Sequence, residues 1–83
     1  MNKQIAKKTI ILYVLKMIEK GSCKERPITF TNIAKVLKNL GIPCDRKTVG
    51  RNVEYLIEFG YPIIKLPGGG CYIDETAPKK SFI

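Results

Sequence analysis

Four side chains that can donate hydrogen bonds to phosphates and base edges lie close together in the middle of the chain. They are Arg46, Lys47, Thr48 and Arg51, and Asp45 precedes them. Arginine and lysine are frequent partners of phosphate oxygens and of guanine, and threonine contacts either kind of acceptor. We therefore expect this segment to contact a nucleic acid.

The charges along the same segment run in an unusual order. At 100° per residue, one helix face carries Lys47 and Arg51 first and then Glu54 and Glu58. A solvated helix usually has acidic side chains first, because they are favourable at the positive N-terminal end of the helix dipole. The inverted order predicts that the first half approaches phosphates and bases while the second half rises away from them. An ordinary charged face without a partner is the alternative.

Gly50 lies among these predicted contacts, inside the helix. A glycine at such a position costs roughly 1 kcal/mol relative to alanine, so a reason for it is expected. Close approach of the backbone to DNA is one explanation, and close packing against a neighbouring helix is the other. We include Gly50 in the predicted DNA-binding set.

Three amphipathic segments would position these residues. Apolar spacing predicts helices over residues 3–20, 30–40 and 46–59. The predicted core-facing residues are Ile11, Val14, Leu15 and Ile18 in the first helix, Ile33, Val36, Leu37 and Leu40 in the second, and Val49, Val53, Leu56 and Ile57 in the third. Two short helices with a tight connection, followed by an outward basic face, are typical of a helix-turn-helix.

Polar residues and glycines define where these helices begin and end. Thr29 and Asp45 are the predicted N-caps of the second and third helices, since both can accept a hydrogen bond from a backbone N–H in the first turn. Gly21, Gly41 and Gly60 directly follow the apolar periodicity and are predicted to end the three helices.

A hairpin is predicted after the third helix, with strands at 63–66 and 71–73 joined by a proline and three glycines. Lys65 precedes this turn and is expected to contact phosphate or the minor groove. Thr31 and Asn32, at the start of the second helix, are expected to offer N–H groups to a backbone phosphate. The fold class is therefore mainly α with a small β-hairpin, a three-helix winged helix-turn-helix.

The composition agrees with a polyanionic partner. The 83 residues contain 15 Lys and Arg against 7 Asp and Glu, which gives a net charge of +8. Such a charge favours association with nucleic acid, although acidic proteins and anionic lipid remain open on charge alone. A chain of this length makes one small domain with a thin core, in which a deep catalytic pocket is not expected.

Catalytic, metal and membrane functions find little basis in the sequence. It has no His and no paired carboxylates on a helix face that faces a cleft, and Cys23, Cys44 and Cys71 lack the spacing of a zinc site. We expect no catalytic residues, no metal and no cofactor. We expect the three thiols to be buried or half-buried and to stay reduced in the cytosol. Without a signal peptide or a run of ~20 apolar residues, we expect a cytoplasmic or nucleoid-associated protein.

Several of these motifs together resemble a known family. The matching residues are Ile33-Ala34, Asp45-Arg46-Lys47-Thr48-Val49 with Arg51, Glu54 to Leu56, Gly60-Tyr61-Pro62-Ile63 and Gly69-Gly70-Cys71-Tyr72-Ile73. From the first helix to about Asp74, the chain resembles the N-terminal winged helix-turn-helix of DeoR-like and WYL-domain bacterial transcriptional regulators. The resemblance implies operator binding through Arg46, Lys47, Thr48 and Arg51. Members often carry an aromatic residue where this chain has Gly50.

The sequence thus predicts a DNA-binding domain at 1–74 and a flexible tail at 75–83. The expected function is sequence-specific binding of double-stranded DNA by a bacterial transcriptional regulator, either an excised domain that lacks its C-terminal effector domain or a small stand-alone protein. A winged-helix protein-interaction module is the alternative. It would use the apolar row Ile10, Tyr13 and Met17, which is also the candidate surface for a weak homodimer. The other interpretation of this row is that it widens the core-facing stripe of the first helix.

Overall fold

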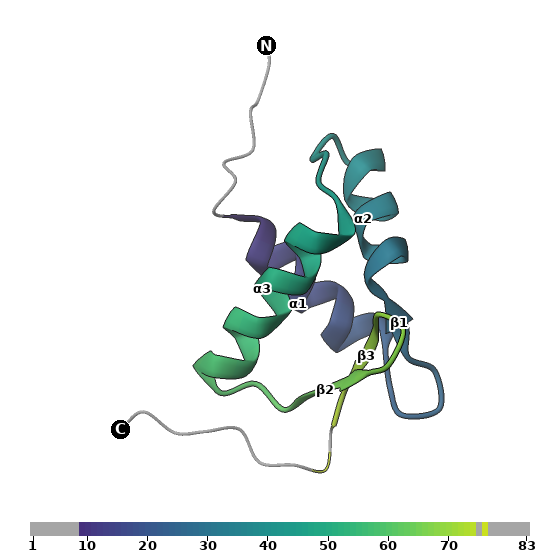
Figure 1. Ribbon diagram of the computed structural model, residues 1–83, viewed down its shortest axis with the longest axis vertical. Coiled ribbons are helices and arrows are strands. Elements are labelled where there is room, and N and C mark those ends of the chain that lie inside the picture. The colour runs from purple at the N-terminus through teal and green to yellow at the C-terminus, as the bar shows by residue number, and fades with distance from the viewer. Residues whose placement is uncertain (1–8, 75, 77–83) are drawn as a thin grey trace.

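The computed structural model describes residues 9–74 and Thr76. Its helices are α1 (Ile10–Gly21), α2 (Phe30–Asn39) and α3 (Arg46–Phe59), and its strands are β1 (Ile28–Thr29), β2 (Ile63–Leu66) and β3 (Gly70–Ile73). The helices pack together, and the small sheet lies at one end of them (Figure 1). Residues 3–8 of the predicted first helix, and residues 75 and 77–83 of the predicted tail, lie outside the described residues.

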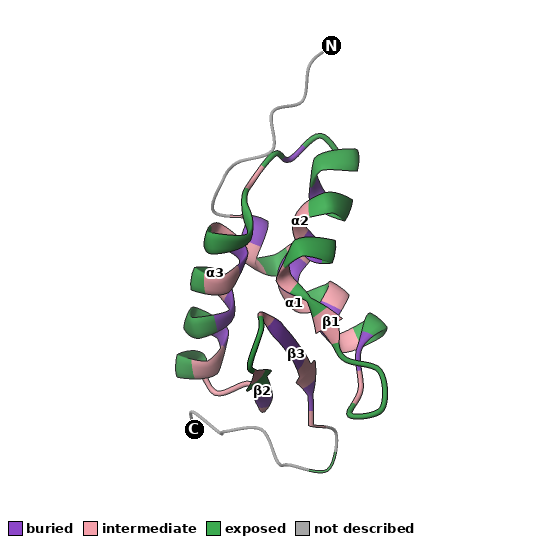
Figure 2. Ribbon diagram, turned by 45° about the vertical axis from the view of Figure 1, so that its right-hand side comes forward, coloured by how far each residue is buried: buried purple, intermediate pink, exposed green. Residues whose placement is uncertain are grey.

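Side chains from all three helices and from β3 form a single core. Figure 2 shows the buried residues on the inner sides of these elements and the exposed ones on the outer sides. The fully buried side chains are Val14, Ile18, Ile33, Leu37, Val49, Val53 and Cys71. The apolar periodicity therefore predicted the inward faces of α1 and α3 correctly.

The predicted core face of α2 was only half right. Ile33 and Leu37 are fully buried, but Val36 is 42% exposed and Leu40 is 53% exposed. Phe30, which the apolar spacing did not place in the core, is half-buried and packs against it. The helix is therefore turned so that the row of residues 30, 33 and 37 faces inward, at the i, i+3, i+7 spacing of a helix.

The predicted helix caps are confirmed at four positions. The Asn32 N–H donates to Thr29 Oγ1 at 3.1 Å, and the Thr48 N–H donates to Asp45 Oδ1 at 2.8 Å. Gly41 and Gly60 follow α2 and α3 with φ values of 85° and 125°. This left-handed conformation is accessible to glycine at little cost, and it turns the chain out of each helix.

Gly21 does not end α1 as predicted, because it is the last helical residue and Ser22 is the cap. The buried Ser22 hydroxyl donates to the Ile18 carbonyl at 2.6 Å and accepts the Ile73 N–H at 3.2 Å. A side-chain hydroxyl satisfies a carbonyl of the last turn, so the end of α1 does not need a glycine in the left-handed conformation.

The sheet has one strand more than the predicted hairpin. Its order is β1-β3-β2, with both pairs antiparallel. β1 pairs through Ile28 with Cys71 and through Thr29 with Gly70, so that β3 begins at Gly70. Two residues are too few for a periodic signal, and the partner strand lies far away in sequence. The sequence could therefore not indicate β1.

Three helices followed by a β2–β3 hairpin, here called the wing, define a winged helix-turn-helix. In the part of the chain that the structure describes, no helix has the length and apolar character needed to cross a membrane.

Ile10 of the apolar row on α1 is buried, while Tyr13 and Met17 are half-buried and packed against the core.

Candidate nucleic-acid interface

A cleft of about 350 Å³ opens where α2 begins, α3 begins and the wing turns. It is lined by Phe30 and Thr31 from α2, Arg46, Lys47 and Gly50 from α3, and Gly68 and Gly69 from the wing. Four of the predicted site residues therefore meet in one hollow: Thr31, Arg46, Lys47 and Gly50. Its rim is basic, and its wall includes an aromatic ring.

The first turns of α3 present their cations to solvent. Arg46, Lys47 and Arg51 are all exposed, and Arg51 lies one turn beyond Lys47 on the same side of the helix. Glu54 and Glu58 are exposed farther along α3, so the predicted order of basic and then acidic residues is present on the surface. The positive end of the helix dipole adds to the charge of the first turns.

Asp45 fixes the start of this helix. The pKa of the Asp45 carboxyl lies below its ordinary value. The largest cause is a hydrogen bond with the Thr48 backbone, followed in size by one with the Thr48 side chain, and the Lys47 charge acts in the same direction. The carboxylate is therefore ionised at neutral pH. It closes the first turn, and Arg46 and Lys47 project from the residues that follow.

Thr48 lies deeper than the cations around it. It is half-buried, and its carbonyl accepts a hydrogen bond from Asn52 Nδ2 at 2.8 Å. Asn52 thus uses its amide to brace the helix from the half-buried side. Of the five predicted contacts on α3, Thr48 and Gly50 are half-buried, whereas Arg46, Lys47 and Arg51 are exposed.

The start of α2 offers less to a phosphate than the sequence predicted. The Phe30 N–H donates to the Gly69 carbonyl of the wing at 2.8 Å, and the Asn32 N–H is taken by Thr29. Among the described residues, the Thr31 N–H has no hydrogen-bond acceptor, unlike the N–H groups of Phe30 and Asn32. Thr31 also lines the cleft, whereas Asn32 does not.

Lys65, the predicted contact in the wing, already has a partner. Its ammonium group forms an ion pair with the Glu54 carboxylate on α3, and both side chains are about half exposed. Lys65 does not line the cleft. Within the described structure, its charge is therefore compensated, and the pair joins the wing to the second half of α3.

Phe30, Gly68 and Gly69 line the cleft but are absent from the DNA-binding set predicted from the sequence. The glycines were assigned only to the turn, and Gly68 and Gly69 do have positive φ. The spacing of Phe30 from Ile33 and Leu37 could have placed it on the inward row of α2. The sequence could not show that its ring would also reach the start of α3.

The three cysteines differ in burial: Cys71 is buried, and Cys23 and Cys44 are half-buried. All three thiols are free, and burial raises the pKa of the Cys71 thiol to about 11. Burial and the adjacent Asp45 charge also raise the pKa of Cys44. The Cys44 and Cys71 thiols are thus protonated at neutral pH. Among residues 9–74 and 76, no group of His, Cys, Asp and Glu could hold a metal ion.

Comparison of the chain with protein-family models, with curated proteins and with solved structures gives no match. The functional assignment therefore depends on the cleft and the charges around it.

Proposed function

We propose that this chain binds double-stranded DNA as the DNA-binding domain of a bacterial transcriptional regulator. In this proposal, the first half of α3 enters the major groove, and the start of α2 and the wing turn approach the backbone on either side. The observation that supports it best is the convergence of Arg46, Lys47 and Thr31 on one cleft beside exposed Arg51.

The distribution of charge supports this docking. Arg46, Lys47 and Arg51 lie within the first two turns of α3, so they can reach one short stretch of duplex. Glu54 and Glu58 lie in the later turns, where they would repel phosphates if the whole helix lay flat in the groove. The helix therefore enters with its N-terminal end first.

The wing contributes little affinity in this proposal. Lys65 is its single cation, and the pair with Glu54 reduces its availability to phosphate. Backbone N–H groups at the glycine turn can approach the duplex closely because Gly68 and Gly69 carry no side chains. Most of the affinity then comes from α3 and from counterion release by the net charge of +8.

A protein-interaction module is less well supported. The apolar row that would serve it packs against the core of the same molecule. We therefore place the chain with DNA-binding regulators, as its resemblance to DeoR-like and WYL-domain proteins suggests. Its proposed location is the bacterial cytoplasm, at the nucleoid, where free thiols are maintained.

A DNA titration at two salt concentrations tests this proposal. The 83-residue chain is titrated into a fluorescent duplex of about 20 base pairs at roughly 50 and 200 mM salt. Contacts to several phosphates predict a loss of affinity that is linear in log salt, with a slope of about −0.9 per contact. Binding that does not respond to salt, or no binding at low salt, would contradict the proposal.

A further inference from the structure

Gly50 has neither a conformational nor a steric reason to be glycine. The described glycines with positive φ are Gly41, Gly60, Gly68 and Gly69, so Gly50 has a backbone that any residue can adopt. A Cβ atom added to Gly50 would lie 3.4 and 3.5 Å from two ring carbons of Phe30. These are van der Waals contact distances, so an alanine would fit and would also be the better helix former.

The missing side chain instead leaves the edge of the Phe30 ring formed by these two carbons uncovered by residue 50. Both residues line the cleft, and the Cβ of any other residue at position 50 would lie directly against the ring. The Phe30 N–H donates to the Gly69 carbonyl, which fixes this residue between α3 and the wing. A fixed apolar surface with Arg46 and Lys47 beside it is thus available to a ligand.

We propose that Phe30, left open by Gly50, contacts the C5 methyl group of a thymine and so helps to determine sequence specificity. This inference rests on the proposed function, since it places the ring against a base edge in the major groove. Thymine is the base that presents a methyl group there, and the other bases present hydrogen-bond donors and acceptors. A phenyl ring can satisfy only the methyl group, while Arg46 and Lys47 contact the flanking acceptors.

The first test replaces Gly50 by alanine. Gly50→Ala should raise the melting temperature, because it removes a helix-interior glycine, and should weaken DNA binding about tenfold, because the new methyl group covers the ring. Glu58→Ala, at an exposed position in the last turn of α3, is the matched control and should not weaken binding. A Gly50→Ala protein that is more stable and binds DNA as wild type does would overturn the inference.

The second test changes the DNA. A duplex selected by the wild-type chain from a random library is compared with the same duplex made with deoxyuridine in place of thymidine. Loss of one buried methyl contact should weaken binding about fourfold. Phe30→Leu has a shorter apolar side chain and should discriminate less between the two duplexes than the wild type does. Equal affinity of the wild type for both duplexes would overturn the inference but leave DNA binding intact, whereas no binding to any duplex would overturn both.

A spectroscopic measurement serves as a readout if Phe30→Leu fails to fold. With fluorinated phenylalanine in the wild-type chain, the Phe30 signal should shift when the duplex is added, and the Phe59 signal should not. Phe59 lies nine residues beyond Gly50 on α3, about 13 Å along the helix axis. An unshifted Phe30 signal in a saturated complex would overturn the inference.

Discussion

Lys65 of β2 and Glu54 of α3 form an ion pair that joins the wing to the proposed recognition helix. Both side chains are about half exposed, so the pair adds little to stability. The main effect of the pair is to compensate the charge of Lys65, the one cation of the wing, on the side of the molecule that carries Arg51.

Glu54→Gln should therefore strengthen DNA binding by roughly two- to fivefold, the size expected for one surface ion pair. The change frees Lys65 for phosphate and should make the salt slope steeper by about one contact. Glu58→Gln removes the same charge without freeing Lys65, and it controls for the general loss of repulsion. If the double variant Glu54→Gln/Lys65→Ala binds as tightly as Glu54→Gln, Lys65 does not reach the DNA.

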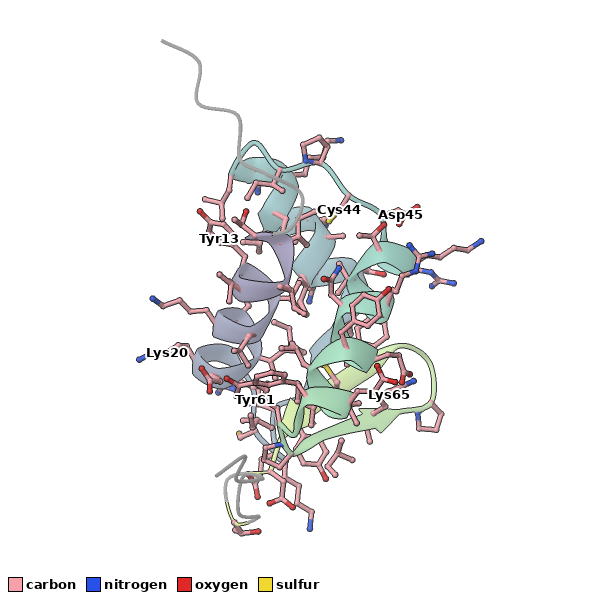
Figure 3. All side chains as sticks on the ribbon, turned by 90° about the vertical axis from the view of Figure 1, so that its left-hand side faces the viewer. Tyr13, Lys20, Cys44, Asp45, Tyr61 and Lys65 are labelled. Carbon is pink, nitrogen blue, oxygen red and sulfur yellow. The ribbon has the colours of Figure 1, made fainter. Side chains whose placement is uncertain are left out.

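Lys47→Ala and Arg51→Ala should each weaken DNA binding by about 1–3 kcal/mol where the side chain reaches a base. Both are exposed on the first half of α3, so the fold should be unaffected. Lys20→Ala is the matched control: Lys20 projects from the opposite side of the molecule from Asp45, which marks the start of α3 (Figure 3). Equal losses in all three variants would indicate a nonspecific charge effect and contradict the assignment of α3.

Thr29→Ala should lower the free energy of unfolding by roughly 1 kcal/mol, because it removes the acceptor of the Asn32 N–H. Thr29→Ser keeps the hydroxyl and should stay close to wild type. Thermal unfolding followed by circular dichroism measures both. An alanine variant that melts with the wild type would show that the hydroxyl does not stabilise α2.

Ser22→Ala should cost about 1–3 kcal/mol, because it leaves the Ile18 carbonyl and the Ile73 N–H without the hydroxyl that joins them. Denaturant unfolding gives the value, and amide exchange at Ile73 should accelerate more than that of the α2 amides. Lys24→Ala, in the exposed turn nearby, is the control. A variant as stable as wild type would contradict a joining role for the hydroxyl.

The Asp45 cap should be lost in acid. Because the folded pKa of Asp45 lies below its unfolded value, the cap stabilises α3 above the unfolded value, near 3.9, and is lost as the pH falls through the folded value. The Thr48 amide resonance, followed between pH 6 and pH 2, should titrate below pH 3.9. Asp45→Asn caps without titrating and should abolish that transition; a wild-type midpoint above 3.9 would contradict the predicted direction.

The features that the sequence predicted depend on local chemistry. Thr29 and Asp45 cap helices a few residues away, and Gly41 and Gly60 act on the turn that they end. The features that it missed depend on distant partners. β1 exists because β3 passes beside it, Ser22 joins Ile73 across the fold, and Lys65 meets Glu54 only after the wing folds back.

The residues of the candidate site also divide into those that local sequence could predict and those that depend on distant partners. Arg46, Lys47 and Arg51 could be predicted because their exposure follows from helical periodicity within α3 itself. Phe30 could not, because its role depends on the packing of α2 against α3 and on the Gly69 carbonyl of the wing. A cleft built from three separate elements leaves no contiguous signal in the sequence.

The strand order also affects the tendency of the sheet to aggregate with other chains. β3 contains buried Cys71 and Ile73 and lies in the middle of the sheet, with a neighbour on each side. The outer strands are β1, with two residues, and β2, with four residues and a lysine among them. Short edge strands and edge lysines discourage strand addition from another chain. The sheet therefore offers a poor template for aggregation, even though its central strand is strongly apolar.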